Sequence, residues 1–260
     1  MNRLSAHIGY LYTELPLPDR LAAAARDGFT AVEHPEPWDV PAREMKARLD
    51  DLGLTFSQVT SGMGGGGGNG LAALPGREAA FCDGFARALD YALTIGCPFV
   101  HPMAGIGGDA TTYRANIDWS IRQCEGTAAC VLVEAISLPG YHLGQLAQAE
   151  ALQDATGGAI RLLFDTFHAA AEGVDTVAWL SVNAHRIGHV HVADHPGRHE
   201  PGTGNLPFDA IRARLRASGY AGVIGFEYLP STAGSGFLHD WKALACETVP
   251  AGPAEHTRIP

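Results

Sequence analysis

The sequence predicts a (β/α)8 TIM barrel, and three observations lead to this fold class. Short runs rich in Val, Ile, Leu and Phe alternate with longer segments of helical period, about eight times along the 260 residues. Several helical segments end at a glycine just before the next apolar run, as at Gly28, Gly53 and Gly96. Eight such units in this length fit a closed parallel barrel better than a doubly wound open sheet, which more often has fewer strands.

The expected strands are short and regularly spaced. They are residues 6–10, 30–33, 54–60, 98–103, 130–134, 159–165, 188–193 and 222–227. Helical segments between them include residues 18–28, 41–53, 77–96, 111–124 and 206–219. We expect one barrel domain over residues 1–248 and a C-terminal tail over 249–260, where no periodicity remains.

Charge and composition exclude several classes of partner. The formal net charge is −10, with 18 basic against 28 acidic residues and no basic cluster, so we expect neither nucleic acid nor a membrane as a partner. No apolar run is long enough to span a bilayer, and the N-terminus lacks a signal-peptide pattern. Five cysteines without a C-x-x-C pair predict reduced thiols rather than a disulfide framework. The expected location is the cytoplasm. The sequence is compatible with either a monomer or a homo-oligomer.

A glycine-dense segment follows the third expected strand. Residues 61–70, SGMGGGGGNG, fit neither helix nor strand, and in a barrel they would form a loop on the active-site face. No helix begins directly after the segment, which argues against a phosphate-binding loop. We expect a mobile flap.

Each of the last four expected strands ends in or near a residue that can bind a metal. These residues are Glu134, Asp165, His191 and Glu227. In a barrel the four strand ends are neighbours on the face that carries the chemistry. One such residue alone could cap a helix or face solvent, but four in consecutive strands favour a shared ion. Three carboxylates and an imidazole suit Mn²⁺, Mg²⁺ or Co²⁺, and the geometry could also admit Zn²⁺.

Further polar residues near these strand ends are predicted to bind substrate. His168 lies three residues beyond Asp165, and His101 ends the fourth strand. His189 shares a strand face with His191 and is expected one layer deeper in the barrel. Arg198, in the loop PGRHEPGTG, is suited to a substrate carboxylate, although a surface arginine is the alternative. His199 and Glu200 are expected to position this loop.

The chain resembles the hydroxypyruvate isomerase family, within the xylose-isomerase-like barrels that include ketose 3-epimerases. The resemblance covers most of the chain and is carried by FDTFHAA, ADHPGRHEPGTGN, VHPMAG and GFEYLP. It implies one divalent metal bound by Glu134, Asp165, His191 and Glu227, with Glu134 and Glu227 also transferring protons. The reaction implied is an aldose–ketose isomerisation through an enediolate, on a small sugar or keto-acid substrate.

The chain also departs from this family pattern. His191 stands where close hydroxypyruvate isomerase relatives usually carry Gln, and Leu229 where a basic residue is expected. The flap after the third strand is polyglycine. These departures concern substrate recognition more than the metal chemistry.

Other functions remain open on the same barrel. A ketose 3-epimerase or a 2-oxo-tetronate isomerase would share the proton transfer, and a metal-dependent lyase or dehydratase would share the ligands. A repair nuclease would need a basic groove, which the charge disfavours. A non-catalytic sugar- or metal-binding protein would not exchange substrate protons with solvent.

Overall fold

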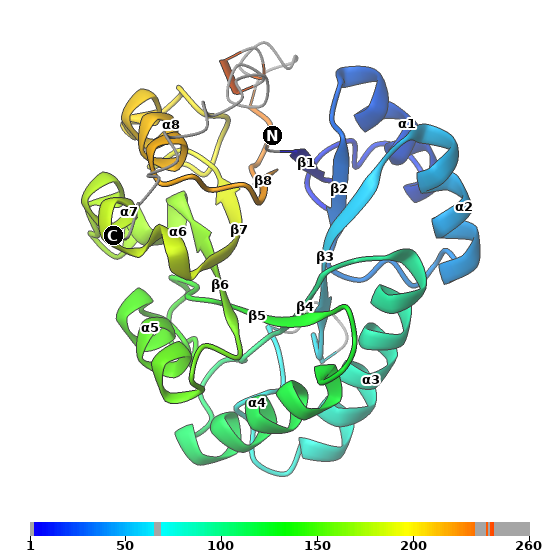
Figure 1. The fold of residues 1–260 in the computed structure, drawn as a ribbon, viewed down its shortest axis with the longest axis vertical. Helices are drawn as coiled ribbons and strands as arrows, with labels where there is room; N and C mark the ends of the chain where they lie inside the picture. The colour runs from blue at the N-terminus through cyan, green and yellow to red at the C-terminus, as the bar shows by residue number, and fades with distance from the viewer. Residues whose placement is uncertain (1–2, 65–68, 232–237, 239, 242–260) are drawn as a thin grey trace, which may run out of the picture.

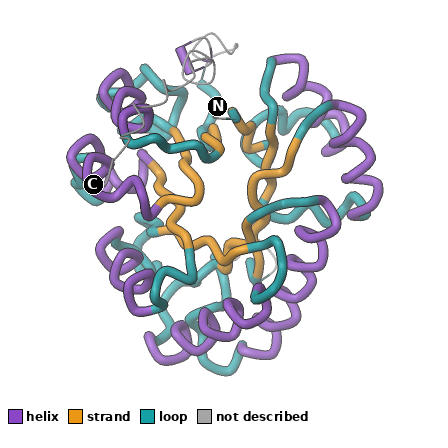
Figure 2. The backbone as a smooth tube through the Cα atoms, in the orientation of Figure 1, coloured by secondary structure: helices purple, strands orange, loops and turns teal. Residues whose placement is uncertain are grey.

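Eight parallel strands close into a barrel in the described part of the chain. The computed structural model describes every residue except 1–2, 65–68, 232–237, 239 and 242–260. The strands follow one another in chain order from β1 to β8, and β8 pairs with β1. Helices surround the barrel on the outside (Figures 1 and 2). The predicted fold class, a single-domain TIM barrel, is therefore confirmed.

The strands lie close to their expected positions. They are β1 (Leu4–His7), β2 (Ala31–His34), β3 (Thr55–Ser61), β4 (Phe99–Pro102), β5 (Cys130–Glu134), β6 (Arg161–Asp165), β7 (Ile187–Val192) and β8 (Val223–Phe226). Only β1 is displaced notably, because a turn begins after His7, where the backbone N–H groups of Tyr10 and Leu11 both donate to the His7 carbonyl.

The outer layer consists of helices that follow the strands. They are α1 (Leu17–Asp27), α2 (Ala42–Leu52), α3 (Glu78–Ile95), α4 (Ala110–Cys124), α5 (Leu146–Ala155), α6 (Thr166–Ala171), α7 (Thr176–Asn183) and α8 (Phe208–Ala217), with a short 3-10 helix over Ala184–Arg186. The expected glycine ends are found on α1, α2 and α3, where Gly28, Gly53 and Gly96 have φ of 88°, 65° and 73°. An L side chain is disfavoured at these angles.

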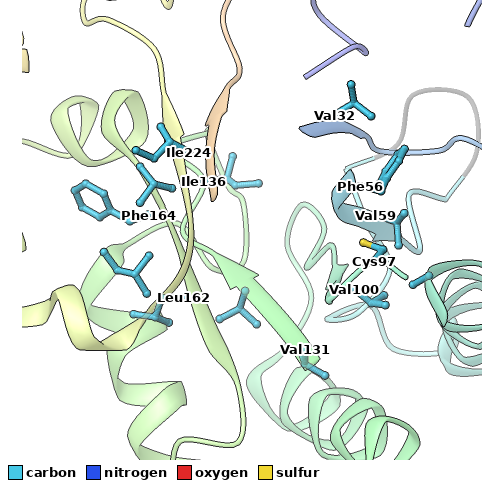
Figure 3. Packing of buried hydrophobic residues seen from close by; sticks show 14 of the residues in the cluster. Val32, Phe56, Val59, Cys97, Val100, Val131, Ile136, Leu162, Phe164 and Ile224 are labelled. Atoms are coloured by element: carbon cyan, nitrogen blue, oxygen red, sulfur yellow. The ribbon is translucent and has the colours of Figure 1, made fainter. Parts of the chain in front are cut away.

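Alternation along the strands separates an apolar outer face from a polar interior. In β7, Val190 and Val192 belong to the hydrophobic core between barrel and helices, whereas His189 and His191 fall on the opposite face. Figure 3 shows the packing of such core side chains, among them Phe164. The register pairs Asp165 of β6 with His191, so their side chains lie at one level of the barrel.

Some expectations fall partly or wholly outside the described residues. The tail at 249–260 does, so the domain boundary stays a prediction. Four cysteines lie in the described part, and all four are free thiols: Cys82, Cys97, Cys124 and Cys130. None of the described helices has both the length and the apolar character needed to cross a bilayer.

Candidate active site

The four predicted metal ligands come together at the carboxyl ends of β5 to β8. Glu134 and Asp165 are the last residues of β5 and β6, His191 is the fifth residue of β7, and Glu227 directly follows β8. One ligand atom from each side chain lies within 4.8 Å of the others. All four side chains are largely buried, and that of Glu227 is 12% exposed. Burying three carboxylates so close together is unfavourable unless positive charge compensates them.

Three potential ligand atoms of this site have no hydrogen-bond partner, as expected for atoms that bind a divalent cation. Among the described residues, no hydrogen-bond partner reaches Glu134 Oε1, Asp165 Oδ2 or His191 Nδ1, although each atom is buried. The Nδ1 atom of His191 lies 3.1 Å from Glu227 Oε2 but is not aligned for a hydrogen bond. Buried polar atoms without partners are rare in folded proteins, and three of them in one place are compatible with a bound cation. Carboxylate oxygens and an imidazole nitrogen are suitable ligands for Mn²⁺, Mg²⁺, Co²⁺ or Zn²⁺.

The two glutamates have opposite protonation preferences in the metal-free protein. Burial raises the pKa of Glu134 well above its usual range, and the neighbouring Glu227 carboxylate adds to this shift. Burial would also raise the pKa of Glu227, but Arg198, His191 and His7 together hold it well below its usual range. Two carboxyl groups whose pKa values diverge in this way are a common arrangement for acid–base chemistry.

Arg198 supplies the positive charge nearest to these carboxylates. Its Nη2 atom donates a hydrogen bond of 2.7 Å to Glu227 Oε2 and lies 3.8 Å from Asp165 Oδ2. The guanidinium group lies over the rings of Tyr10 and Phe167, at 5.1 and 5.5 Å from their centroids. Arg198 therefore lies at the predicted site, and not on the open surface.

Asp194 holds the loop that carries Arg198. Its buried carboxylate accepts four backbone hydrogen bonds, from the N–H groups of His195 (2.8 Å), Gly202 (2.8 Å), Gly204 (2.8 Å) and Leu206 (3.1 Å). Each carboxylate oxygen accepts two of them. This arrangement fixes residues 194–206 at both ends of the loop.

His199 and Glu200 connect the same loop to the chain after β8, as expected from the sequence. His199 Nδ1 lies 2.7 Å from the Leu229 carbonyl, and the Glu200 carboxylate accepts hydrogen bonds from the N–H and hydroxyl of Ser231. These contacts hold Arg198 beside Glu227.

A cavity of about 160 Å³ opens beside the four ligands and is lined by three of them, Glu134, His191 and Glu227. Its lining combines the site with residues of the first half of the chain: His7, Tyr10, Pro35, Gln58, Thr60, Met63, Asn69, His101, Met103, Glu134, Ile136, Leu138, His168, His191, Arg198 and Glu227. Three of the four residues predicted to bind substrate therefore line it, namely His101, His168 and Arg198.

His101 and His168 are neutral donors or acceptors in this cavity. Burial lowers the pKa of His101 to about 3 and also lowers that of His168. The Ser137 N–H donates to His168 Nδ1 at 3.2 Å, so Nδ1 accepts and Nε2 carries the hydrogen. His168 is thereby suited to donate a hydrogen bond to a substrate oxygen.

His189 does not reach the cavity. Its side chain is fully buried one layer below His191, as its place in the strand predicted, and its Nε2 lies 2.8 Å from Glu33 Oε2. A direct contact with substrate is therefore not supported for His189.

Two residues of the site were not singled out from the sequence. His7 ends β1, and its Nε2 lies 3.3 Å from Glu227 Oε1. Glu33 lies in β2 and contacts both His189 and His191. Both are polar residues at strand ends, the same signal that identified Glu134.

The described ends of the glycine-dense segment lie at the cavity. Met63 and Asn69 line it, and Gly70 forms a bridge with Ala104. Residues 65–68 lie outside the described residues, so the flap stays a prediction.

Comparison with known proteins supplies the family. The family model for the xylose isomerase-like TIM barrel matches residues 21–244. The chain belongs to this family. It is 38% identical to the 2-oxo-tetronate isomerase of Cupriavidus necator, over 92% of this chain and 98% of the relative. It is 31% identical to the hydroxypyruvate isomerase of Escherichia coli, over 89% of this chain and 95% of the relative. These relatives are isomerases, which confirms the resemblance and the expected enzyme class.

Solved structures agree with this assignment. A Brucella melitensis protein described as an AP endonuclease of family 2 superposes with a TM-score of 0.87 at 29% identity, covering 93% of this chain and 99% of that chain. An L-ribulose 3-epimerase superposes with a TM-score of 0.74 at 25% identity, covering 94% and 86%.

Proposed function

We propose that this xylose isomerase-like barrel is a metal-dependent isomerase of a short sugar or keto acid, of the hydroxypyruvate isomerase type. The observation that carries the proposal is the convergence of Glu134, Asp165, His191 and Glu227 on one buried space beside a cavity. The curated relatives named hydroxypyruvate isomerase and 2-oxo-tetronate isomerase support the same reaction class.

The reaction moves a proton between adjacent carbons of the substrate. A divalent cation at the four ligands would polarise the substrate carbonyl and stabilise the negative charge of the enediolate. Glu134 ends β5 and Glu227 directly follows β8, so the two carboxylates approach the site from different strands. One is placed to remove the proton alpha to the carbonyl, and the other to return one to the neighbouring carbon.

Other residues orient the substrate and hold it. Arg198 offers two donors in one plane, which suits a substrate carboxylate. His168 and His101 are suited to hydrogen-bond hydroxyl or carbonyl oxygens, since both are neutral and line the cavity. The cavity of about 160 Å³ is smaller than the roughly 300–1,000 Å³ of pockets for drug-sized ligands, which favours a short substrate.

Several related functions compete with this proposal. A 2-oxo-tetronate isomerase shares the chemistry and is favoured by the C. necator relative. A ketose 3-epimerase would return the proton to the carbon it came from, and a lyase would release water. A nuclease is disfavoured despite the name of the Brucella neighbour, because the net charge of −10 opposes a phosphate backbone.

Solvent-deuterium exchange tests the proposal. Short keto acids and ketoses of three to six carbons are incubated with the metal-loaded protein in D₂O, and products are resolved by NMR. Isomerisation gives a new carbonyl position with deuterium at the adjacent carbon, epimerisation gives deuterium at an inverted centre, and a lyase gives a dehydrated product. No metal-dependent exchange with any substrate would contradict the isomerase.

Variants assign the proton-transfer groups. Glu134→Gln and Glu227→Gln should each lower turnover by about 10²–10⁴-fold, because general acid–base catalysis contributes on this order. Glu44→Gln is the matched control and should turn over like the wild type, because Glu44 is exposed on helix α2, outside the site. Near wild-type exchange in a metal-bound Gln variant would show that the glutamate replaced is only a ligand.

A further inference from the structure

Glu33 is a fully buried carboxylate in the barrel interior that the proposed reaction does not use. It lies in β2, and its Oε2 atom is 2.8 Å from His189 Nε2 and 3.0 Å from His191 Nε2. Its side chain and that of His189 are 0% exposed. One oxygen atom is thus shared by two imidazole rings, one of which belongs to a proposed metal ligand.

The neighbouring strand leaves room for this carboxylate. Gly225 of β8 pairs with His191 in the sheet register. A Cβ atom at Gly225 would lie 2.2 Å from Glu33 Oε1 and 2.8 Å from His191 Cδ2. Real Cβ atoms do not approach other atoms this closely, so the absence of a side chain at Gly225 lets the Glu33 carboxylate lie beside both rings.

The contact decides which nitrogen of His191 faces the site. A carboxylate oxygen shared by two ring nitrogens accepts a hydrogen from each, so Nε2 of His191 carries hydrogen. In neutral His191, the form that can bind a metal ion, the lone pair is then on Nδ1, the atom that lies 3.1 Å from Glu227 Oε2 and has no hydrogen-bond partner in the described structure. The ring is therefore oriented with its acceptor nitrogen toward the three carboxylates.

We propose that Glu33 is a positioning residue that holds His191 with Nδ1 directed at the metal site and thereby strengthens divalent-metal binding. His189 donates to the same oxygen and keeps the Glu33 carboxylate in place. Partners of this kind orient metal-ligating histidines and raise their basicity, and their loss typically weakens metal affinity by about 10–100-fold. The inference rests on the metal site of the proposed function.

The test measures metal affinity in the absence of substrate. Metal-free wild type, Glu33→Gln and Glu33→Ala are titrated with Co²⁺, following the visible absorption bands of the bound ion, and with Mn²⁺ by calorimetry. Gln keeps one acceptor oxygen and loses the charge, so we expect about 10-fold weaker binding; Ala loses the acceptor, so we expect up to about 100-fold. The Co²⁺ bands should also shift, because the His191 ring is no longer held.

A matched control separates positioning from loss of stability. Ser57 is buried in the same barrel interior and hydrogen-bonds Ser5, at 2.7 Å, without touching either histidine. Ser57→Ala also removes a buried hydrogen-bonding group and should lower the melting temperature of the metal-free protein, yet leave the Co²⁺ affinity and bands unchanged.

Three outcomes would overturn the inference. In the first, the wild type binds one ion, and Glu33→Gln binds Co²⁺ with an affinity within about 2-fold of the wild type and with unchanged bands. The proposed function would then still stand. In the second, the wild type binds two ions and Glu33→Gln binds one. Glu33, His189 and His191 would then form a second metal site. The last is wild type binding no divalent ion at millimolar concentration, which would remove the metal-dependent function as well.

Discussion

Replacing Asp194 by Asn should release the loop that carries Arg198. The carboxylate accepts four backbone hydrogen bonds, two on each oxygen. An amide keeps one acceptor oxygen and presents an NH₂ group to the other pair of N–H donors. Two bonds to a charged acceptor are therefore lost, each typically worth about 1.5–3 kcal/mol. We expect Asp194→Asn to lower the free energy of unfolding by about 3–6 kcal/mol.

Urea unfolding and hydrogen exchange measure this loss. Unfolding monitored by circular dichroism gives the free energy, and exchange of the backbone amides of Gly202, Gly204 and Leu206 reports the loop directly. Turnover should fall as well, because Arg198 no longer lies beside Glu227. A general weakening of the barrel would instead speed exchange throughout.

Asp175→Asn is the matched control. Asp175 caps α7 with a single oxygen, which accepts from the N–H groups of Val177 (3.0 Å) and Ala178 (2.9 Å). Asn caps a helix as well as Asp does, so Asp175→Asn should change the free energy of unfolding by no more than about 0.5 kcal/mol. If Asp194→Asn costs no more than Asp175→Asn, the two-oxygen account of the loop is wrong.

Three further predictions follow from the site and its surroundings. Asp165→Asn should weaken binding of Mn²⁺ or Co²⁺ in calorimetry, and unchanged affinity would remove Asp165 from the ligand set. Arg198→Met should raise KM for keto acids more than for neutral ketoses; an equal rise for both would exclude a carboxylate contact. His34 accepts a hydrogen bond from the Glu36 N–H, and burial lowers its pKa from 6.5 to about 3, so the unfolded chain binds a proton that the folded protein does not between these values. The free energy of unfolding should thus fall as pH drops below 6.5, and His34 contributes at most about 1.4 kcal/mol per pH unit to this fall. In urea unfolding, His34→Gln should show a smaller fall than the wild type. Equal falls in the two proteins would show that His34 is not a source of the pH dependence.

Local patterns in the sequence were sufficient for the fold and for part of the site. β5 begins and ends as predicted, because Cys130–Glu134 is an apolar run bounded by a carboxylate. Alternation also placed His189 and His191 on one face of β7. These features depend only on residues close together in the chain, so a single sequence reveals them.

Two residues of the site, His7 and Glu33, were missed for different reasons: a misplaced strand boundary and a contact between distant strands. His7 was overlooked because the first strand was predicted about three residues too late, which hid the end of β1. Glu33 ends a predicted strand, but its contacts with His189 and His191 exist only when β2, β7 and β8 meet in the right register. No local pattern in the sequence specifies that meeting.

The separation between Glu33 and His191 also has a consequence for folding kinetics. The two residues are 158 positions apart, and they meet only when β8 pairs with β1. Closing a loop of that length costs roughly 4–5 kcal/mol in chain entropy, so such contacts form late and slow the folding rate. An intermediate with an open barrel could bring the four ligands of β5 to β8 together but would lack the contact between Glu33 and His191. Metal-induced absorption during refolding should therefore reach its final spectrum only with the last kinetic phase, when the barrel closes.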